Sequence, residues 1–385
     1  MSIRLPAAAL ALVVVFGAVH PPVLGAPLEG SRVAWMFVGV VSAGLLVVAL
    51  LARGSSRLTV FYGPQVVLLA FVAWRVTRAP EGLEATEEVL RGLWILLSVV
   101  VVVLAAAQLD RRRCIDAIVA ATACLVAAGI MWSLVDGPAR FADAGALDLS
   151  GWQGIERTST HFGLTAAVLV AASAASTHHR IPRRVGLLAL GGVAVIATGS
   201  TTAIVVVVAA GATALQATLP ARRRRWVGLA AASTITLCLL AGPGLLDNDV
   251  MRSADERLEL WADQAEWVTE RPIFGHGSGS TATRVEAVHA DLVEAGQVGV
   301  GSVDRFTLRN LWLHVFADNG FVGVMILFAM LVVYVRRREV PDRADVFVVA
   351  WLVASLAEYS MADSPDALSL SLAAALTQAG RPLRA

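Results

Sequence analysis

The sequence predicts an all-α polytopic membrane protein with about twelve transmembrane helices. Of its 385 residues, 57% are apolar and only 16% are charged. A soluble domain is ordinarily about 25% charged. The apolar residues are gathered in long runs, and a transmembrane helix needs about 20 such residues. Short arginine clusters fall at every second connection between these runs, which is typical of helices that cross a membrane alternately.

The elements follow the order of the apolar runs. Helices one to nine are expected within residues 1–246, a large loop with an amphipathic helix at 247–310, and helices ten to twelve within 311–385. A second connection of some size is expected at 135–161. The apolar segments are expected at residues 7–26, 33–51, 58–74, 89–107, 114–134, 162–176, 185–199, 201–218, 226–246, 311–335, 345–360 and 366–379.

Arginine sets the expected orientation, because cytoplasmic connections are enriched in basic residues. The clusters are Arg53 with Arg57, Arg111 to Arg113, Arg180 with Arg183 and Arg184, Arg222 to Arg225, and Arg336 to Arg338 with Arg343. With these in the cytoplasm, both termini are cytoplasmic and the 247–310 loop lies outside a bacterial cytoplasmic membrane. Residues 23–26 also resemble a signal-peptide cleavage site, and cleavage or retention of the first span leaves the later orientation unchanged.

Several classes of protein are excluded or disfavoured by composition. The chain has no lysine, which removes Schiff-base chemistry and any P-loop. Cys114, Cys124 and Cys238 form no CxxC pair and no HExxH motif is present, so neither a metal nor a cofactor is expected. No Asp, Glu or Arg lies near the middle of an expected span, which disfavours an ion-coupled carrier. The lipid bilayer is an expected partner, and nucleic acid is not.

The large loop is expected to contain an amphipathic helix. Ser253 and Glu256 form a capping box that starts it near Ala254, and Pro272 ends it. An apolar stripe and an acidic stripe are predicted, comprising Leu258, Trp261, Ala265 and Val268, and Glu256, Glu259, Asp263, Glu266 and Glu270. Arg257 lies one turn before Trp261 on the packed side. A buried arginine needs an anion, either a substrate phosphate or a loop carboxylate.

Residues 273–279 are expected to form a flexible turn after this helix. Their glycines are compatible with a phosphate-binding loop, but they follow a helix and not a strand, so they are not a dinucleotide fingerprint. His276 within the turn is either an ordinary loop histidine or a substrate ligand.

The start of the tenth span carries polar residues on one face. Asn310, His314 and Asp318 are spaced i, i+4, i+8, and Arg305 and Arg309 lie just outside. Polar side chains on a helix that enters lipid face the bundle or a wet cavity. They either hydrogen-bond to neighbouring helices or form an active site in which Asp318 orients His314 as a base.

These residues resemble the O-antigen ligase and O-antigen polymerase family. Arg257 to Trp261, followed by Pro272-Ile-Phe-Gly275-His-Gly277, is similar to the family's Arg-x-x-x-Trp and Pro-x-x-Gly-x-Gly segment. Arg309-Asn310, followed by Gly320-Phe-Val-Gly323, is similar to its His-Asn-x9-Gly-x-x-Gly signature. The expected large outer loop between spans nine and ten also agrees with the topology of this family.

The resemblance implies transfer of a glycan from a polyprenyl-pyrophosphate carrier to an unknown acceptor, without nucleotide or obligatory metal. It places Arg257 at the pyrophosphate, with Arg305 and Arg309 as further cations. His314, or less favourably His276, supplies the base. Trp261, Asn310 and Arg157 complete the expected substrate contacts.

Two positions depart from the family pattern. Arg309 stands where the signature has histidine, and Thr198-Gly199-Ser200-Thr201 lacks the arginine of the family's Ser-Arg. Three alternatives remain open: a ligase with its base moved to His314, a polymerase that extends the glycan on its carrier, and a non-catalytic protein that binds lipid-linked saccharides.

Overall fold

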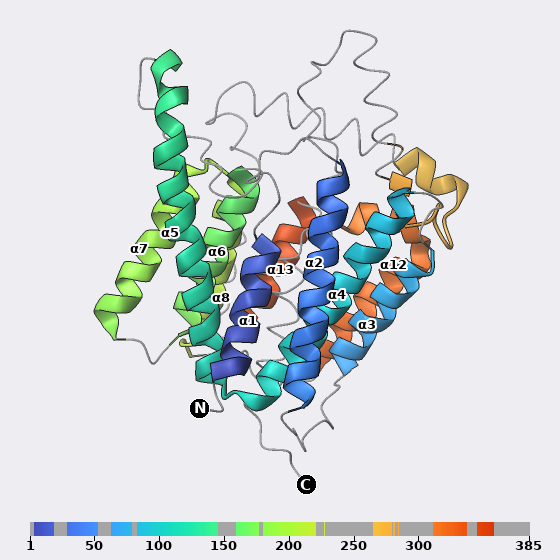
Figure 1. The fold of residues 1–385 in the computed structure, drawn as a ribbon, viewed down its shortest axis with the longest axis horizontal. Helices are drawn as coiled ribbons and strands as arrows, with labels where there is room; N and C mark the ends of the chain where they lie inside the picture. Colours follow the sequence, from blue (N-terminus) through green and yellow to red (C-terminus); the bar gives the residue numbers. More distant parts are fainter. Residues whose placement is uncertain are drawn as a thin grey trace.

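The computed structural model describes ten helices in one bundle (Figure 1). The described residues are 4–18, 29–52, 63–78, 83–144, 159–176, 180–220, 227, 265–278, 280–281, 284, 311–336 and 345–357, and they contain no strand. The helices are α1 (Arg4–Ala18), α2 (Glu29–Leu51), α3 (Gly63–Val76), α4 (Leu83–Gln108), α5 (Arg111–Ala144), α6 (Ser159–Ala175), α7 (Ile181–Ala197), α8 (Thr201–Gln216), α12 (Leu311–Arg336) and α13 (Asp345–Ala357).

These helices match the expected spans closely, apart from two that the described residues do not cover. The span expected at 366–379 lies outside them, and so does nearly all of 226–246. Arg112–Leu134 and Leu311–Val332 are long and apolar enough to cross a membrane, and shorter apolar helices accompany them. The described fold is all-helical and consistent with that of a helical membrane protein.

The apolar part of α5 ends at Leu134, where the sequence predicted, and the connection expected from residue 135 begins as a continuation of the same helix. Helix α5 has 34 residues and continues to Ala144, which gives it a length of about 50 Å. That exceeds the roughly 30 Å of a bilayer's hydrocarbon core. A hydropathy pattern detects only the apolar part of a helix. It does not detect where the helix ends, because polar and charged residues can continue the same helix in water.

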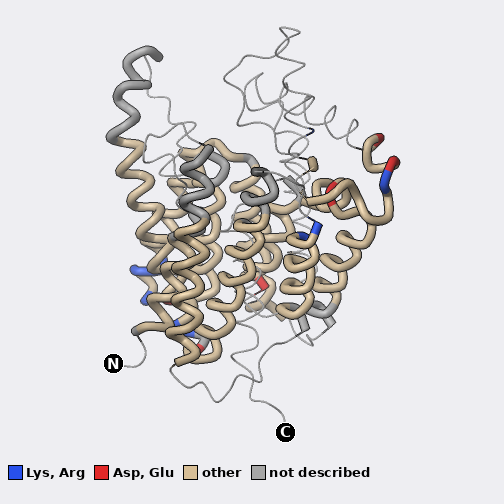
Figure 2. Tube along the Cα trace, turned by 45° about the vertical axis from the view of Figure 1, so that its right-hand side comes forward, with Lys and Arg blue, Asp and Glu red and all other residues tan. Residues whose placement is uncertain are grey.

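Packing brings the end of α3 beside the start of α12. Helix α3 contacts both α4 and α12, while α6, α7, α8 and α13 form the neighbouring group. The core is built mainly from Ala, Val and Leu, with Phe71, Phe162, Phe347 and Trp351 as the largest fully buried side chains. Charged residues are sparse along the described helices and lie mostly near their ends (Figure 2).

The turn between α7 and α8 lies where the family arginine was expected. Gly199 has φ 62°, and Ser200 caps α8 by accepting a hydrogen bond from the Ala203 amide at 3.2 Å. Thr198 donates to the Val195 carbonyl at 2.8 Å. This tight turn therefore ends α7 and begins α8 within three residues, Thr198 to Ser200.

Candidate functional site

A break in α12 organises the N-terminal part of the helix. Gly320 has φ 63° and ψ −166°, so the helical hydrogen bonds cannot continue across it. The preceding loop replaces them with backbone hydrogen bonds from His276 N to Ala317 O (3.0 Å), Gly277 N to Asp318 O (2.8 Å), Phe321 N to Pro272 O (2.8 Å) and Val322 N to Ile273 O (3.2 Å). Residues 272–277 form a turn, as the sequence predicted, and these hydrogen bonds join it to α12.

Glycines of the two family-like motifs allow this close approach. Gly275 has φ 69°, and a Cβ there would overlap the backbone of Asp318 and Asn319. A Cβ on Gly320 would overlap the backbone of Ile273 and Gly275. Three residues further along α12, a Cβ on Gly323 would approach the Trp74 ring of α3 to 3.1 Å. The glycines thus bring the loop and α3 onto α12.

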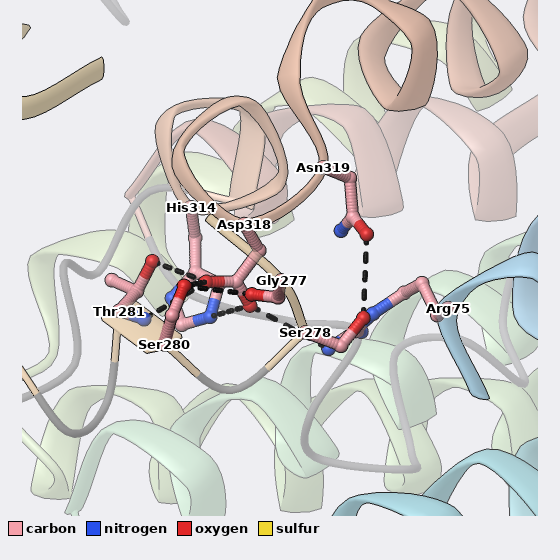
Figure 3. A network of polar contacts seen from close by, with 8 residues as sticks. All are labelled: Arg75, Gly277, Ser278, Ser280, Thr281, His314, Asp318 and Asn319. Atoms are coloured by element: carbon pink, nitrogen blue, oxygen red, sulfur yellow. Dashed lines mark hydrogen bonds and ion pairs between the residues drawn. The ribbon is translucent and has the colours of Figure 1, made fainter. Parts of the chain in front are cut away.

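Asp318 is the centre of the polar cluster that results (Figure 3). Its side chain is fully buried. Oδ1 accepts hydrogen bonds from the Thr281 amide at 2.9 Å, from the Thr281 hydroxyl, and from the Ser280 hydroxyl at 3.2 Å. A buried carboxylate needs such donors, because leaving it without them costs several kcal/mol. Asp318 therefore ties residues 280–281 to α12.

The other carboxylate oxygen faces His314 and Arg75. His314 Nε2 lies 3.2 Å from Asp318 Oδ2, and Arg75 Nη2 lies 4.0 Å from the same oxygen. All three side chains are buried. Since a carboxylate only accepts hydrogen bonds, we assign the hydrogen in this contact to Nε2 of His314, which makes Nδ1 the basic nitrogen of the neutral ring. The predicted contact between His314 and Asp318 is confirmed.

A second set of contacts joins Ser278 to α12 and to the residues that follow α3. The Ser278 hydroxyl donates to Asn319 Oδ1 at 3.3 Å, and the Ser278 amide donates to the Arg78 carbonyl at 2.9 Å. Ser278 and Asn319 are both fully buried. Ser278, Ser280 and Thr281 therefore connect the C-terminal end of α3 with the N-terminal part of α12.

His276 points away from this cluster towards Trp267. Its Nε2 lies 3.0 Å from the Trp267 carbonyl oxygen, and the two rings are stacked with centroids 4.0 Å apart. The Arg284 guanidinium lies 5.0 Å from the Trp267 ring centroid. These contacts give His276 a structural environment, and its expected part in substrate binding stays a prediction.

The end of the amphipathic helix agrees in part with expectation. Residues 265–270 are helical and the helix ends before Pro272, as predicted. Val268 is buried, and Glu266 and Glu270 are exposed, also as predicted. Ala265 was expected to face inward but is exposed. Trp267 is buried there because its larger ring stacks on His276.

Sequence reasoning missed several residues of the cluster. Arg75, Ser280, Thr281 and Asn319 were not predicted. The only sequence signal for Arg75 is its position at the C-terminal end of an apolar segment, and for the hydroxyls it is their run after the glycine-rich turn. Six other candidates lie outside the described residues: Arg157, Arg257, Trp261, Arg305, Arg309 and Asn310.

Within the described ranges, no group of three or more His, Cys, Asp or Glu side chains is placed to hold a metal ion. Asp318 is surrounded by hydrogen-bond donors and one cation, Arg75, instead. The cluster is suited to holding an imidazole in one orientation, which is a requirement of general acid–base chemistry.

The described helices form a bundle in which a buried His–Asp–Arg cluster lies near the start of a membrane-length helix, an arrangement consistent with a helical membrane protein that carries a polar site. Residues 186–328 match the family model described as O-antigen ligase. The matched range includes most of α7, all of α8, the described residues of the 265–284 segment and the His314–Asp318 pair. The resemblance inferred from the motifs is thus confirmed over these residues. No curated protein matches the chain.

Proposed function

We propose that the protein transfers a glycan from a polyprenyl-pyrophosphate carrier to an acceptor hydroxyl at the outer side of the bacterial cytoplasmic membrane. The observation that carries the proposal is the His314–Asp318 contact at 3.2 Å, within the range that matches the O-antigen ligase model. A histidine oriented by a buried carboxylate is suited to removing a proton from a hydroxyl.

In the proposed reaction, the acceptor oxygen attacks the anomeric carbon of the donor glycan. His314 takes the hydroxyl proton on Nδ1 while Asp318 holds Nε2–H. The bond between the anomeric carbon and the phosphate oxygen breaks, and the carrier leaves as its pyrophosphate. The departing charge needs cations, and Arg257, Arg305 and Arg309 are the proposed ones, because a guanidinium can bind a phosphate through two hydrogen bonds.

Arg309 has a particular place in this proposal. It stands where the family signature has histidine, so the base is proposed to lie one turn further along α12 at His314. Arg309 then joins the cations and offsets the arginine that is missing after Ser200. Asn310, Trp261, Arg157 and His276 are proposed to contact the substrate.

Transfer assays in proteoliposomes, with defined lipid-linked donors and acceptors, test the proposal. His314→Ala is expected to lower kcat by about 10²–10⁴ and to leave the donor KM nearly unchanged. Arg309→Ala and Arg257→Ala are expected chiefly to raise the donor KM, with Arg257→Lys only partly restoring it. Arg309→His is expected to remain below wild type because a cation is lost.

The outcomes separate the alternatives. A single addition to a separate acceptor supports the ligase, whereas a ladder of products on the carrier supports the polymerase. If wild type transfers nothing and Arg309→His gains activity, the relocated base is wrong. If wild type binds donors without transfer and no variant gains activity, the non-catalytic alternative stands.

A further inference from the structure

Arg75 is a buried cation that the proposed reaction does not yet use. It lies in the last turn of α3, and only 5% of its surface is exposed. Burying a guanidinium costs several kcal/mol unless an anion and hydrogen bonds compensate for the lost water. Its described anion is Asp318, at the oxygen that also faces His314.

The two oxygens of Asp318 have different surroundings. Residues 280–281 supply three donors to Oδ1 and fix the carboxylate in place. Oδ2 is shared between the imidazole at 3.2 Å and the guanidinium at 4.0 Å. A separation of 4.0 Å is too long for a hydrogen bond, so Arg75 acts on this oxygen through its charge.

We propose that Arg75 is a positioning residue, which keeps Asp318 as the hydrogen-bond acceptor of His314 and so determines which ring nitrogen meets the acceptor hydroxyl. The inference rests on the proposed function for its role in catalysis. The tautomer of His314 that it predicts can be measured without any transfer activity. Without the cation, the negative charge of Asp318 loses compensation in a buried site and its contact with His314 weakens.

Arg78 offers a matched control one turn further along. It also lies near the outer end of α3, but its guanidinium lies 5.6 Å from the Trp74 ring centroid and 5.5 Å from that of Phe274. Its backbone carbonyl, which accepts from Ser278, is unaffected by substitution of the side chain. Arg78→Gln therefore removes a cation from the same region without removing the one beside Asp318.

The kinetic test is a double-mutant cycle on the full chain in proteoliposomes. Arg75→Gln is expected to lower kcat about tenfold to a hundredfold with the donor KM changed less than about twofold, because the coupling acts through Asp318. Arg75→Lys should retain most of the activity, since charge and not a forked contact is required. The effect of Arg75→Gln should vanish in an Asp318→Asn background, and Arg78→Gln should stay close to wild type.

Two kinetic results would overturn the inference. A raised donor KM that persists in the Asp318→Asn background would make Arg75 a direct substrate contact. If the double variant lowers kcat by the product of the Arg75→Gln and Asp318→Asn effects, the two residues act independently. If Arg75→Gln does not insert, Arg75→Lys carries the test, because loss of activity with the charge retained contradicts the mechanism.

A second readout separates this inference from the proposed function. Imidazole ¹⁵N chemical shifts of histidine-labelled protein report the tautomer, and a His314→Gln sample identifies the His314 signal. Wild type is expected to show Nε2–H, and both Arg75→Gln and Asp318→Asn should shift this equilibrium, whereas Arg78→Gln should not. An unchanged His314 signal in Arg75→Gln overturns the inference even if no glycan transfer is detected.

Discussion

Gly275 and Gly320 lie backbone against backbone, so that a Cβ on Gly320 would overlap the Gly275 amide nitrogen. Each residue has a positive φ, near 69° and 63° respectively. The contact joins two motifs that are separated in the sequence, and it brings residues 278–281 to Asp318. The glycines therefore determine whether residues 278–281 can reach Asp318.

Alanine at either glycine should destabilise the protein strongly. Gly275→Ala and Gly320→Ala each add a Cβ that overlaps backbone and force a left-handed conformation on alanine, for an expected loss of about 3 kcal/mol or more. Thermal unfolding of purified protein in detergent measures this loss. Gly192→Ala is the control: it lies within α7 with no atom within 4 Å of the added Cβ, so it should be neutral or slightly stabilising. Equal unfolding temperatures for all three would contradict the packing described.

Asp318→Asn should also reduce stability, through electrostatics and not shape. The amide has nearly the same volume, but it removes the negative charge beside Arg75 and weakens the bonds from Thr281. Removing one member of a buried pair costs about 3–5 kcal/mol. Asp110→Asn is the matched change at the surface, where Asp110 and Arg113 form an exposed pair at 3.6 Å, and about 0–1 kcal/mol is expected there. A loss in Asp318→Asn no larger than that in Asp110→Asn would argue against a buried ionic cluster.

The helices of the bundle were largely predictable, because each one corresponds to an apolar run that is visible in the local sequence. Helix α8 begins at Thr201 and α12 at Leu311, as the sequence predicted. The extension of α5 to Ala144 was not predictable from hydropathy, since that part of the helix is not an apolar run.

The site was predictable only where it lies within one helix. His314 and Asp318 are one turn apart on α12, so helical periodicity alone brings them together. Arg75 reaches the same carboxylate from α3, and no local pattern specifies which two distant helices become neighbours. Thr281 was missed for the same reason, because its bond to Asp318 depends on the path of the loop after Gly275.

Cysteine accessibility tests the orientation of the bundle in a background without Cys114, Cys124 and Cys238. A cysteine at Glu270, which is exposed in the segment before Pro272, should react with an impermeant maleimide in intact cells. A cysteine at Arg183, exposed at the start of α7, should react only after permeabilisation. The arginine distribution requires this difference. The reverse pattern would invert the topology and place the candidate site in the cytoplasm.

The turn before Gly275 should contact lipid at the outer face of the membrane. Ile273 and Phe274 are 60% and 55% exposed, and the bond from Val322 N to Ile273 O places the turn beside Phe321, which is 57% exposed. Exposed apolar side chains grouped in this way face lipid or a partner, and an arginine close to aromatic rings, as Arg78 is to Phe274, is typical of the membrane interface.

Spin labels at single introduced cysteines measure this contact. A label at Phe274 is expected to collide more often with oxygen, which concentrates in lipid, than with a water-soluble nickel chelate. The opposite ratio is expected at Glu266, which is exposed on the charged face of the preceding helical segment. The comparison controls for differences in label mobility, because both sites are exposed and lie within the same short stretch of chain. If the nickel chelate relaxes the Phe274 label as effectively as the Glu266 label, the turn lies in water, and the exposed face of residues 273–274 must then bind something other than lipid.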